Sequence, residues 1–87
     1  MYRLIITPDF EKEMKHLISG DGEIKEKLIK TFKELLTDPD HPALRTHKLA
    51  SRQNWSISVD MSTRIIFELD GDNVVFTRIG SHDTVYS

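Results

Sequence analysis

The spacing of apolar residues changes once along this chain, from a helical period to a strand period. Between Pro8 and Leu36 apolar residues recur with the spacing of helices that bury one face. From Trp55 to Val59 they alternate with polar residues, as in a strand with one buried face, and two further short apolar-rich segments follow at 64–69 and 74–79. The change follows the segment 38–42, Asp-Pro-Asp-His-Pro, whose prolines stop a helix. This order predicts an α+β domain in which helices cover one face of a sheet.

Each predicted helix has a recognisable start. Thr7 supplies a capping hydroxyl and Pro8 occupies the first helical position, after which an apolar face forms from Phe10, Met14, Leu17 and Ile18. We expect Gly20 to end this helix in a left-handed conformation. Asp21 is a plausible cap for a second helix, whose apolar stripe is Ile24, Leu28, Phe32, Leu35 and Leu36. The short connection predicts a helical hairpin.

The remaining segments predict strands. Residues 2–7 read as a short buried strand, because Leu4, Ile5 and Ile6 form an apolar run, and residues 43–54 read as irregular. Strands are expected at 55–60, 64–69 and 74–79, with a hairpin turn at 70–73 (Asp-Gly-Asp-Asn) and a break at Gly80. The predicted order is β-α-α-β-β-β, a mainly antiparallel sheet with an N-terminal helical hairpin on one face, in a single domain spanning residues 1–87.

Composition excludes several classes of protein. The chain has no cysteine, which excludes disulfides, Cys-based zinc sites and thiol nucleophiles. No apolar run approaches the roughly 18–20 residues of a membrane span, so we expect no membrane association and a cytoplasmic location. The formal net charge is -2, yet residues 41–59 contain no Asp or Glu. Arg45, Lys48 and Arg52 therefore form a local basic patch that can bind phosphates.

Three polar stretches at loops and strand ends could carry chemistry. They are residues 45–49 with His47, then Trp55-Ser56 with the strand that begins at Arg64, and residues 80–86 with His82 and Tyr86. If the last three strands form a meander, Arg64 lies at the end of the sheet where residue 79 finishes. Topology thus predicts that Arg64 and His82 are close.

Such a set suits RNA cleavage through the ribose 2'-hydroxyl. A base removes the 2'-proton, a cation stabilises charge on the phosphoryl oxygens, and an acid protonates the leaving 5'-oxygen. Imidazoles, with an ordinary pKa of about 6.5, serve both proton transfers, and guanidinium matches phosphoryl oxygens. No metal or other cofactor is expected. The residues alone also permit ordinary roles: a solvated loop for Arg45, Lys48 and Arg52, core packing for Trp55, and an ordinary tail for His82 and Tyr86.

A combination of four motifs resembles the RelE/ParE toxin superfamily, closest to its RelE/StbE and YafQ-like branches. The motifs are Arg45-x-His47-Lys48-Leu49, Trp55-Ser56-Ile57-x-Val59, Arg64-Ile65-Ile66-Phe67, and Ile79-Gly80-Ser81-His82-Asp83-x-Val85-Tyr86. Together they cover nearly the whole chain in the family's order and spacing. The resemblance implies a RelE-like (microbial RNase-like) fold and a metal-independent endoribonuclease. Its expected partners are mRNA, the ribosomal A site and a cognate antitoxin that forms a hetero-oligomeric complex with the toxin.

The resemblance also implies roles for particular residues. Arg64 matches the arginine that stabilises phosphoryl charge, His82 the C-terminal general acid, and His47 a candidate general base. Tyr86 corresponds to a C-terminal tyrosine that stacks or donates. Arg45 and Lys48 match positions that hold phosphates, and the proposed RNA-binding set is Arg45, Lys48, Arg52, Trp55 and Arg78.

This sequence departs from the family pattern at several positions. Ala43 and Leu44 stand where some members have a Glu, and Ser58 and Ser62 stand where the YafQ branch has a His and an Asp. Two other functions therefore remain open. One is a ParE-like inhibitor of DNA gyrase without enzymatic activity, and the other is an inactive module that binds only the antitoxin.

Overall fold

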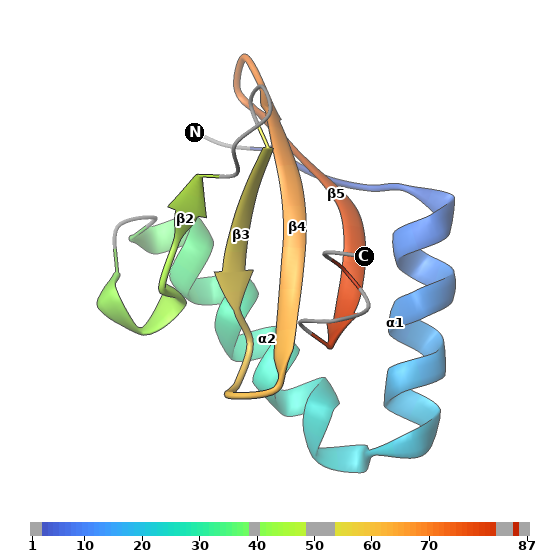
Figure 1. Cartoon of the computed structure of the whole chain (residues 1–87). Coiled ribbons are helices and arrows are strands. Elements are labelled where there is room, and N and C mark those ends of the chain that lie inside the picture. Colours follow the sequence, from blue (N-terminus) through green and yellow to red (C-terminus); the bar gives the residue numbers. More distant parts are fainter. Residues whose placement is uncertain (1–2, 39–40, 49–53, 82–84, 86–87) are drawn as a thin grey trace.

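Two helices and five strands make up the described part of the chain (Figure 1). The computed structural model describes residues 3–38, 41–48, 54–81 and 85, with the backbone alone for residues 43, 47 and 48. In chain order the elements are β1 (Arg3–Ile6), α1 (Pro8–Gly20), α2 (Gly22–Thr37), the 3-10 turn η1 (Pro42–Leu44), β2 (His47–Lys48), β3 (Asn54–Ser58), β4 (Thr63–Asp70) and β5 (Asn73–Ser81). Neither helix has the length and apolar character that crossing a bilayer requires.

The strands form one sheet in the order β1-β5-β4-β3-β2. β1 pairs in parallel with β5, and the other neighbours are antiparallel, so the predicted meander of the last three strands is confirmed. The predicted hairpin turn is also confirmed: Asp70 pairs with Asn73, and Gly71 has a φ of 59°, a conformation that favours glycine. The pairing places Gly80 of β5 opposite Arg64 of β4, at the end of the sheet where β5 finishes at Ser81.

Side-chain caps start both helices where the sequence indicated. Thr7 Oγ1 accepts a hydrogen bond from the Phe10 N–H and donates one to the Phe76 carbonyl, so the cap also ties α1 to β5. Asp21 caps α2 by accepting from the Glu23 N–H. Gly20 does not adopt the expected left-handed conformation, because α1 includes it and the chain turns at Asp21, in an extended conformation (φ -150°).

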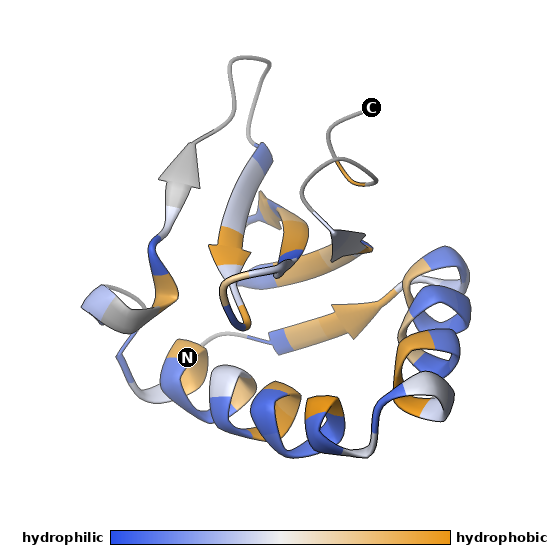
Figure 2. Cartoon of the chain, turned by 60° about the horizontal axis from the view of Figure 1, so that its bottom comes forward, coloured by the Kyte–Doolittle hydropathy of each residue, from blue (hydrophilic) through white to orange (hydrophobic). Residues whose placement is uncertain are grey.

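The hydrophobic core lies between the two helices and one face of the sheet. The apolar sides of the helices turn toward the strands (Figure 2). Phe76 is fully buried at the centre, with its ring 5.3 Å from that of Phe10, 5.2 Å from that of Phe32 and 6.2 Å from that of Phe67. One aromatic side chain therefore joins α1, α2, β4 and β5.

Four local expectations are corrected by the structure. β1 is an edge strand rather than a buried one, with Ile5 41% and Ile6 45% exposed, because only β5 borders it. Leu36 is 47% exposed, since its neighbour Leu35 takes the core position in the last turn of α2. The segment 43–54 holds the end of η1, the two-residue strand β2 and the first residue of β3. β5 continues through Gly80 to Ser81 because pairing with β4 persists there.

Candidate active site

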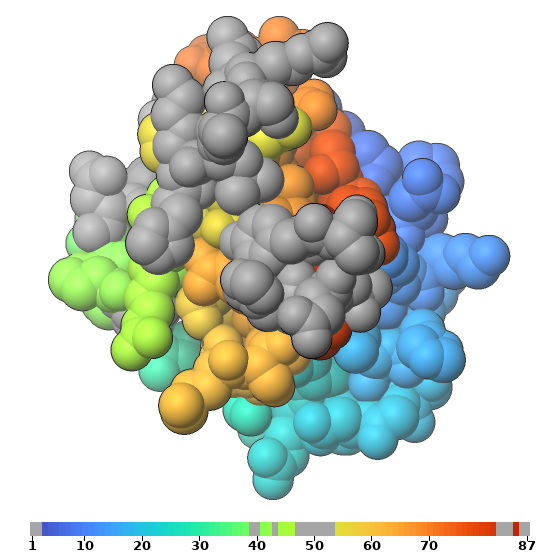
Figure 3. All heavy atoms as spheres, in the orientation of Figure 1, coloured from blue at the N-terminus to red at the C-terminus, as the bar shows by residue number. Residues whose placement is uncertain are grey.

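Arg64 lies on the sheet face opposite the helices. Its neighbour Ile65 and Phe67 both belong to the helix-side core, so alternation along β4 turns Arg64 to the other face. There its Nη2 donates to Ser56 Oγ of β3 at 2.9 Å and to the carbonyl oxygen of Arg45 at 2.9 Å. Figure 3 shows this face, on which the residues after η1 border those of β3 and β4. Three separate segments thus converge on one guanidinium.

One N–H of this guanidinium is buried without a partner. Arg64 Nε is inaccessible to solvent and makes no hydrogen bond in the part of the chain that the structure describes. An unsatisfied buried donor costs about 1–3 kcal/mol, and a charged one costs more. Such groups are rare in native proteins and call for a functional or structural reason.

The backbone of Arg45 is held in an uncommon conformation. Its φ is 46°, in the left-handed region, which costs a non-glycine residue about 1 kcal/mol or more. The preceding residue, Leu44, is fully buried in the core, and the Arg45 N–H donates to the Pro42 carbonyl at 3.1 Å. Core packing of η1 therefore fixes the Arg45 carbonyl beside Arg64, while the Arg45 side chain is exposed.

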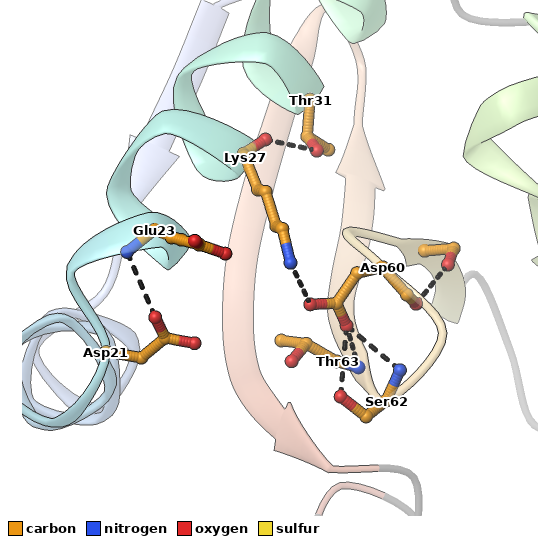
Figure 4. Close-up of polar contacts among 8 residues, drawn as sticks. Asp21, Glu23, Lys27, Thr31, Asp60, Ser62 and Thr63 are labelled. Atoms are coloured by element: carbon orange, nitrogen blue, oxygen red, sulfur yellow. Dashed lines mark hydrogen bonds and ion pairs between the residues drawn. The ribbon is translucent and has the colours of Figure 1, made fainter.

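Asp60 organises the turn that leads into β4 (Figure 4). Its Oδ1 accepts from the N–H groups of Ser62 (2.9 Å) and Thr63 (2.7 Å), and its Oδ2 pairs with Lys27 Nζ of α2 at 3.2 Å. Burial acts to raise the pKa of Asp60, but these hydrogen bonds outweigh it and hold the pKa below its ordinary value. The turn just before Arg64 is thereby anchored to α2.

Asp60→Asn is expected to lower the free energy of unfolding at neutral pH by about 1–2 kcal/mol, because it removes charge-assisted hydrogen bonds. The pKa of Asp60 is lower in the folded protein than in the unfolded chain, where it is about 3.9. The carboxylate therefore stabilises the fold fully at pH values above about 3.9, and this stabilisation is lost as the pH falls through the folded pKa. The stability difference between the two proteins should therefore shrink in acid. Urea unfolding of both proteins at about pH 6 and pH 3 measures this difference. Asp70→Asn is the control, because it removes the charge of an exposed carboxylate. Equal stability of Asp60→Asn and the unmodified chain at about pH 6 would contradict the assignment.

The structure places part of the predicted site around Arg64. The backbone of His47 in β2 is the register partner of Ser56, and Lys48 is that of Trp55. Arg45 contributes its carbonyl oxygen as described. Arg52, His82 and Tyr86 lie outside the described residues, although Gly80, two positions before His82, pairs with Arg64. The predicted closeness of the end of β5 to Arg64 is therefore confirmed for the strand itself.

Two predicted RNA-binding residues are not brought to Arg64. Trp55 is partly buried and packs against the helix-side core, the face opposite Arg64. Arg78 Nη2 pairs with Glu13 Oε2 of α1 at 3.1 Å, and this contact raises the pKa of Arg78. Glu13 Oε1 also accepts the Ile79 N–H at 3.2 Å, along a stretch of β5 that β1 does not reach.

Sequence reasoning missed three groups that build this region, the Arg45 carbonyl, Glu13 and Asp60, and it missed the burial of Ser56. The period-two pattern indicated that Ser56 is on the polar face of its strand, but gave no sign that it is fully buried. The contacts of Glu13 and Asp60 join residues 65 and 33 positions apart, and no local pattern reveals them. Among the described residues no three His, Asp or Glu side chains gather as they would around a metal ion.

The sequence of this chain is similar to that of known proteins. A family model described as the ParE toxin of the type II toxin–antitoxin system parDE matches residues 4–86. A curated relative, RelE4 of Methanocaldococcus jannaschii, is 26% identical over 88 residues, covering 99% of this chain and 92% of the relative.

Solved structures share the fold over the whole chain. YafQ from E. coli strain BL21(DE3) superposes with a TM-score of 0.83 at 20% identity, covering 100% of both chains. A chain from the complex of RelB and RelE, antitoxin and toxin, from Methanococcus jannaschii gives 0.75 at 20% identity, covering 94% of each. The predicted α+β fold of the RelE type is confirmed. Because the family model spans nearly all of it, the chain belongs to the ParE toxins of type II toxin–antitoxin systems, within the RelE/ParE superfamily.

Proposed function

We propose that this toxin is a metal-independent endoribonuclease that cleaves mRNA. The observation that carries the proposal is the Arg64 guanidinium, held by Ser56 and Arg45 through Nη2, while Nε is buried without a hydrogen-bond partner among the described residues. A fixed cation with unsatisfied donors is suited to stabilise the charge that gathers on phosphoryl oxygens in a displacement at phosphorus.

The reaction is a transfer within the RNA. The general base, for which we propose His47, removes the proton of the ribose 2'-hydroxyl. The 2'-oxygen attacks the adjacent phosphorus, and Arg64 stabilises the negative charge on the non-bridging oxygens. His82 protonates the leaving 5'-oxygen, so the products carry a 2',3'-cyclic phosphate and a 5'-hydroxyl, and the role proposed for Tyr86 is to stack on a base or donate a hydrogen bond. Both imidazoles titrate near neutral pH when unperturbed, as general acid–base catalysis needs.

Binding of RNA depends on the basic segment after α2. Arg45 has an exposed side chain, and no acidic residue lies between residues 41 and 59, so we propose that Arg45, Lys48 and Arg52 hold phosphates. Trp55 and Arg78 are proposed as peripheral contacts. The ribosomal A site is the proposed place of cleavage, in the cytoplasm.

An antitoxin is the proposed protein partner. E. coli YafQ has been solved in complex with DinJ, at a TM-score of 0.84 and 21% identity to this chain, and M. jannaschii RelE with RelB. We propose that a cognate antitoxin forms a hetero-oligomeric complex with this toxin in the same way and silences it.

Primer extension on a defined mRNA tests the proposal. The purified toxin is incubated with the mRNA alone and with the same mRNA on ribosomes. The His82→Ala variant is treated in the same two ways. We expect discrete new 5'-ends that the unmodified chain produces and His82→Ala does not. Uncut mRNA in both settings would contradict the proposal, and cleavage that survives His82→Ala would contradict the role given to that residue.

The family assignment favours a second candidate, inhibition of DNA gyrase, because the matching model is that of ParE toxins. A supercoiling assay with purified gyrase separates the two. We expect no inhibition at toxin concentrations that cut mRNA. Gyrase inhibition without RNA cleavage would favour the second candidate, and the absence of both activities would favour an inactive antitoxin-binding module.

Glu13→Gln tests whether Arg78 contacts RNA. Removing the Glu13 charge weakens one of the contacts that hold Arg78. If Arg78 then contacts a phosphate, RNA binding should tighten a few-fold and the salt dependence of log K should steepen by about 0.7 per added contact with single-stranded RNA. Filter binding across salt concentrations measures both. Glu11→Gln on the same helix, where Glu11 pairs with Lys15, is the matched control. If the slopes of the two variants are equal, Arg78 has no such role.

A further inference from the structure

Ser56 is a polar residue with an unusual location. It is completely buried, on the sheet face opposite the hydrophobic core, and its Oγ accepts from Arg64 Nη2 at 2.9 Å. Burying a hydroxyl is unfavourable unless it is hydrogen-bonded. Between β2 and β4, a small side chain with an acceptor leaves room for the guanidinium to lie against the sheet. The contact therefore ties Arg64 to the central strands.

The Arg45 carbonyl oxygen holds the same nitrogen from another direction. It accepts from Nη2 at 2.9 Å, and its position depends on the left-handed backbone of Arg45 (φ 46°) and on buried Leu44 beside it. The acceptors come from β3 and from the loop after η1, so the guanidinium is restrained between two elements. We call Ser56 Oγ and the Arg45 carbonyl oxygen the Arg64 clamp.

We propose that the Arg64 clamp, through Ser56 above all, positions the guanidinium for the phosphoryl group, so that Ser56 is a positioning residue of the reaction. The inference rests on the proposed ribonuclease function. The clamp uses Nη2, and Nε is inaccessible to solvent, so Nη1 is the nitrogen left to donate to the substrate. An unrestrained arginine side chain samples many rotamers, and a donor fixed before the reaction stabilises developing charge best. The clamp is thus expected to act on the chemical step and not on RNA binding.

Ser56→Ala removes one half of the clamp and little volume. In single-turnover cleavage, in whichever setting primer extension finds active, we expect a rate at saturating RNA about tenfold lower, with half-saturation unchanged. Thr31→Val is the matched control, because it removes a buried hydroxyl that bonds the Lys27 carbonyl within α2. This control should cleave at the normal rate.

Two further measurements distinguish positioning from a structural effect. In the Arg64→Ala background, Ser56→Ala should cause no additional loss, because the residue acts through Arg64. In the isolated protein, the NMR order parameter of the Arg64 Nε–H should fall from near the value of rigid backbone, about 0.85, toward about 0.6 in Ser56→Ala.

The possible outcomes separate the two proposals. If the unmodified chain does not cleave RNA, the proposed function fails and the inference with it. If Arg64→Ala cleaves RNA normally, the function stands, but the role of Arg64 fails and the clamp has nothing to position. If Arg64→Ala is impaired while Ser56→Ala cleaves normally, or if Ser56→Ala slows both backgrounds equally, the positioning role is wrong and the function stands. An unchanged order parameter of Arg64 Nε–H would also overturn the clamp.

Discussion

Arg64→Ala is expected to reduce the rate of RNA cleavage by about 100- to 1000-fold, the usual effect of removing one fixed donor that stabilises transition-state charge. The reason is geometric: Nη2 is bound by Ser56 and the Arg45 carbonyl, which fixes the guanidinium and leaves Nη1 for the phosphoryl oxygens. Arg64→Lys keeps the charge but loses the planar fork, so its rate should lie between those of the alanine variant and the unmodified chain. Single-turnover cleavage of a defined mRNA measures all three.

Arg3→Ala is the control for this loss of charge, because Arg3 is an exposed arginine of edge strand β1, separated from β4 by β5. It should cut RNA within about twofold of the normal rate. Thermal unfolding must show that Arg64→Ala is folded. Retention of more than a tenth of the normal rate by a folded Arg64→Ala protein would contradict the role assigned to Arg64.

Phe76→Ala is expected to have the largest effect on stability, about 3–5 kcal/mol in the free energy of unfolding. Its ring is fully buried and contacts the rings of Phe10, Phe32 and Phe67. Small domains have a total stability of about 5–15 kcal/mol, so this single change can leave much of the protein unfolded at 37 °C. Phe76→Leu, which keeps most of the apolar volume, should cost about 1–2 kcal/mol.

Urea unfolding followed by circular dichroism measures these differences. Ile5→Ala is the matched control, because Ile5 is 41% exposed on the edge strand and its truncation should cost less than about 1 kcal/mol. A Phe76→Ala protein that is destabilised by no more than Ile5→Ala would show that the core is not organised around this ring.

The order of elements could be predicted because local signals mark it. Thr7 with Pro8 and Asp21 mark the helix starts, and both cap as expected. Gly71 marks the hairpin turn, and the alternation around Ile57 and Ile65 marks the strands whose buried residues form the core. These features depend on neighbours in the sequence, and a sequence pattern contains that information.

Features set by distant neighbours could not be predicted. An apolar run such as residues 4–6 looks the same in a central and in an edge strand, and only the position of β1 beside β5 exposes Ile5 and Ile6. Alternation defines two faces but does not say which one the helices cover, so the place of Trp55 on the helix side was open.

In the candidate site, too, the features set by local pattern and strand order could be predicted, and those set by distant contacts could not. The meander implied that Arg64 lies beside the end of the last strand, and its pairing with Gly80 agrees. Its hydrogen-bond partners were not foreseeable. The Arg45 carbonyl comes from backbone 19 residues away, and the left-handed conformation that presents it belongs to an arginine, a residue type that gives no sign of it.

The most direct test of the account replaces one ribose in the substrate. The cleavage position of a short mRNA is mapped with the purified toxin, and the same RNA is then made with a single 2'-deoxynucleotide on the 5' side of the scissile phosphate. The account predicts that this RNA resists cleavage at that position, while the all-ribose RNA yields a 2',3'-cyclic phosphate and a 5'-hydroxyl. Cleavage of the deoxy-substituted RNA at the same position and rate would contradict attack by the 2'-oxygen, and with it the roles given to Arg64 and the two histidines.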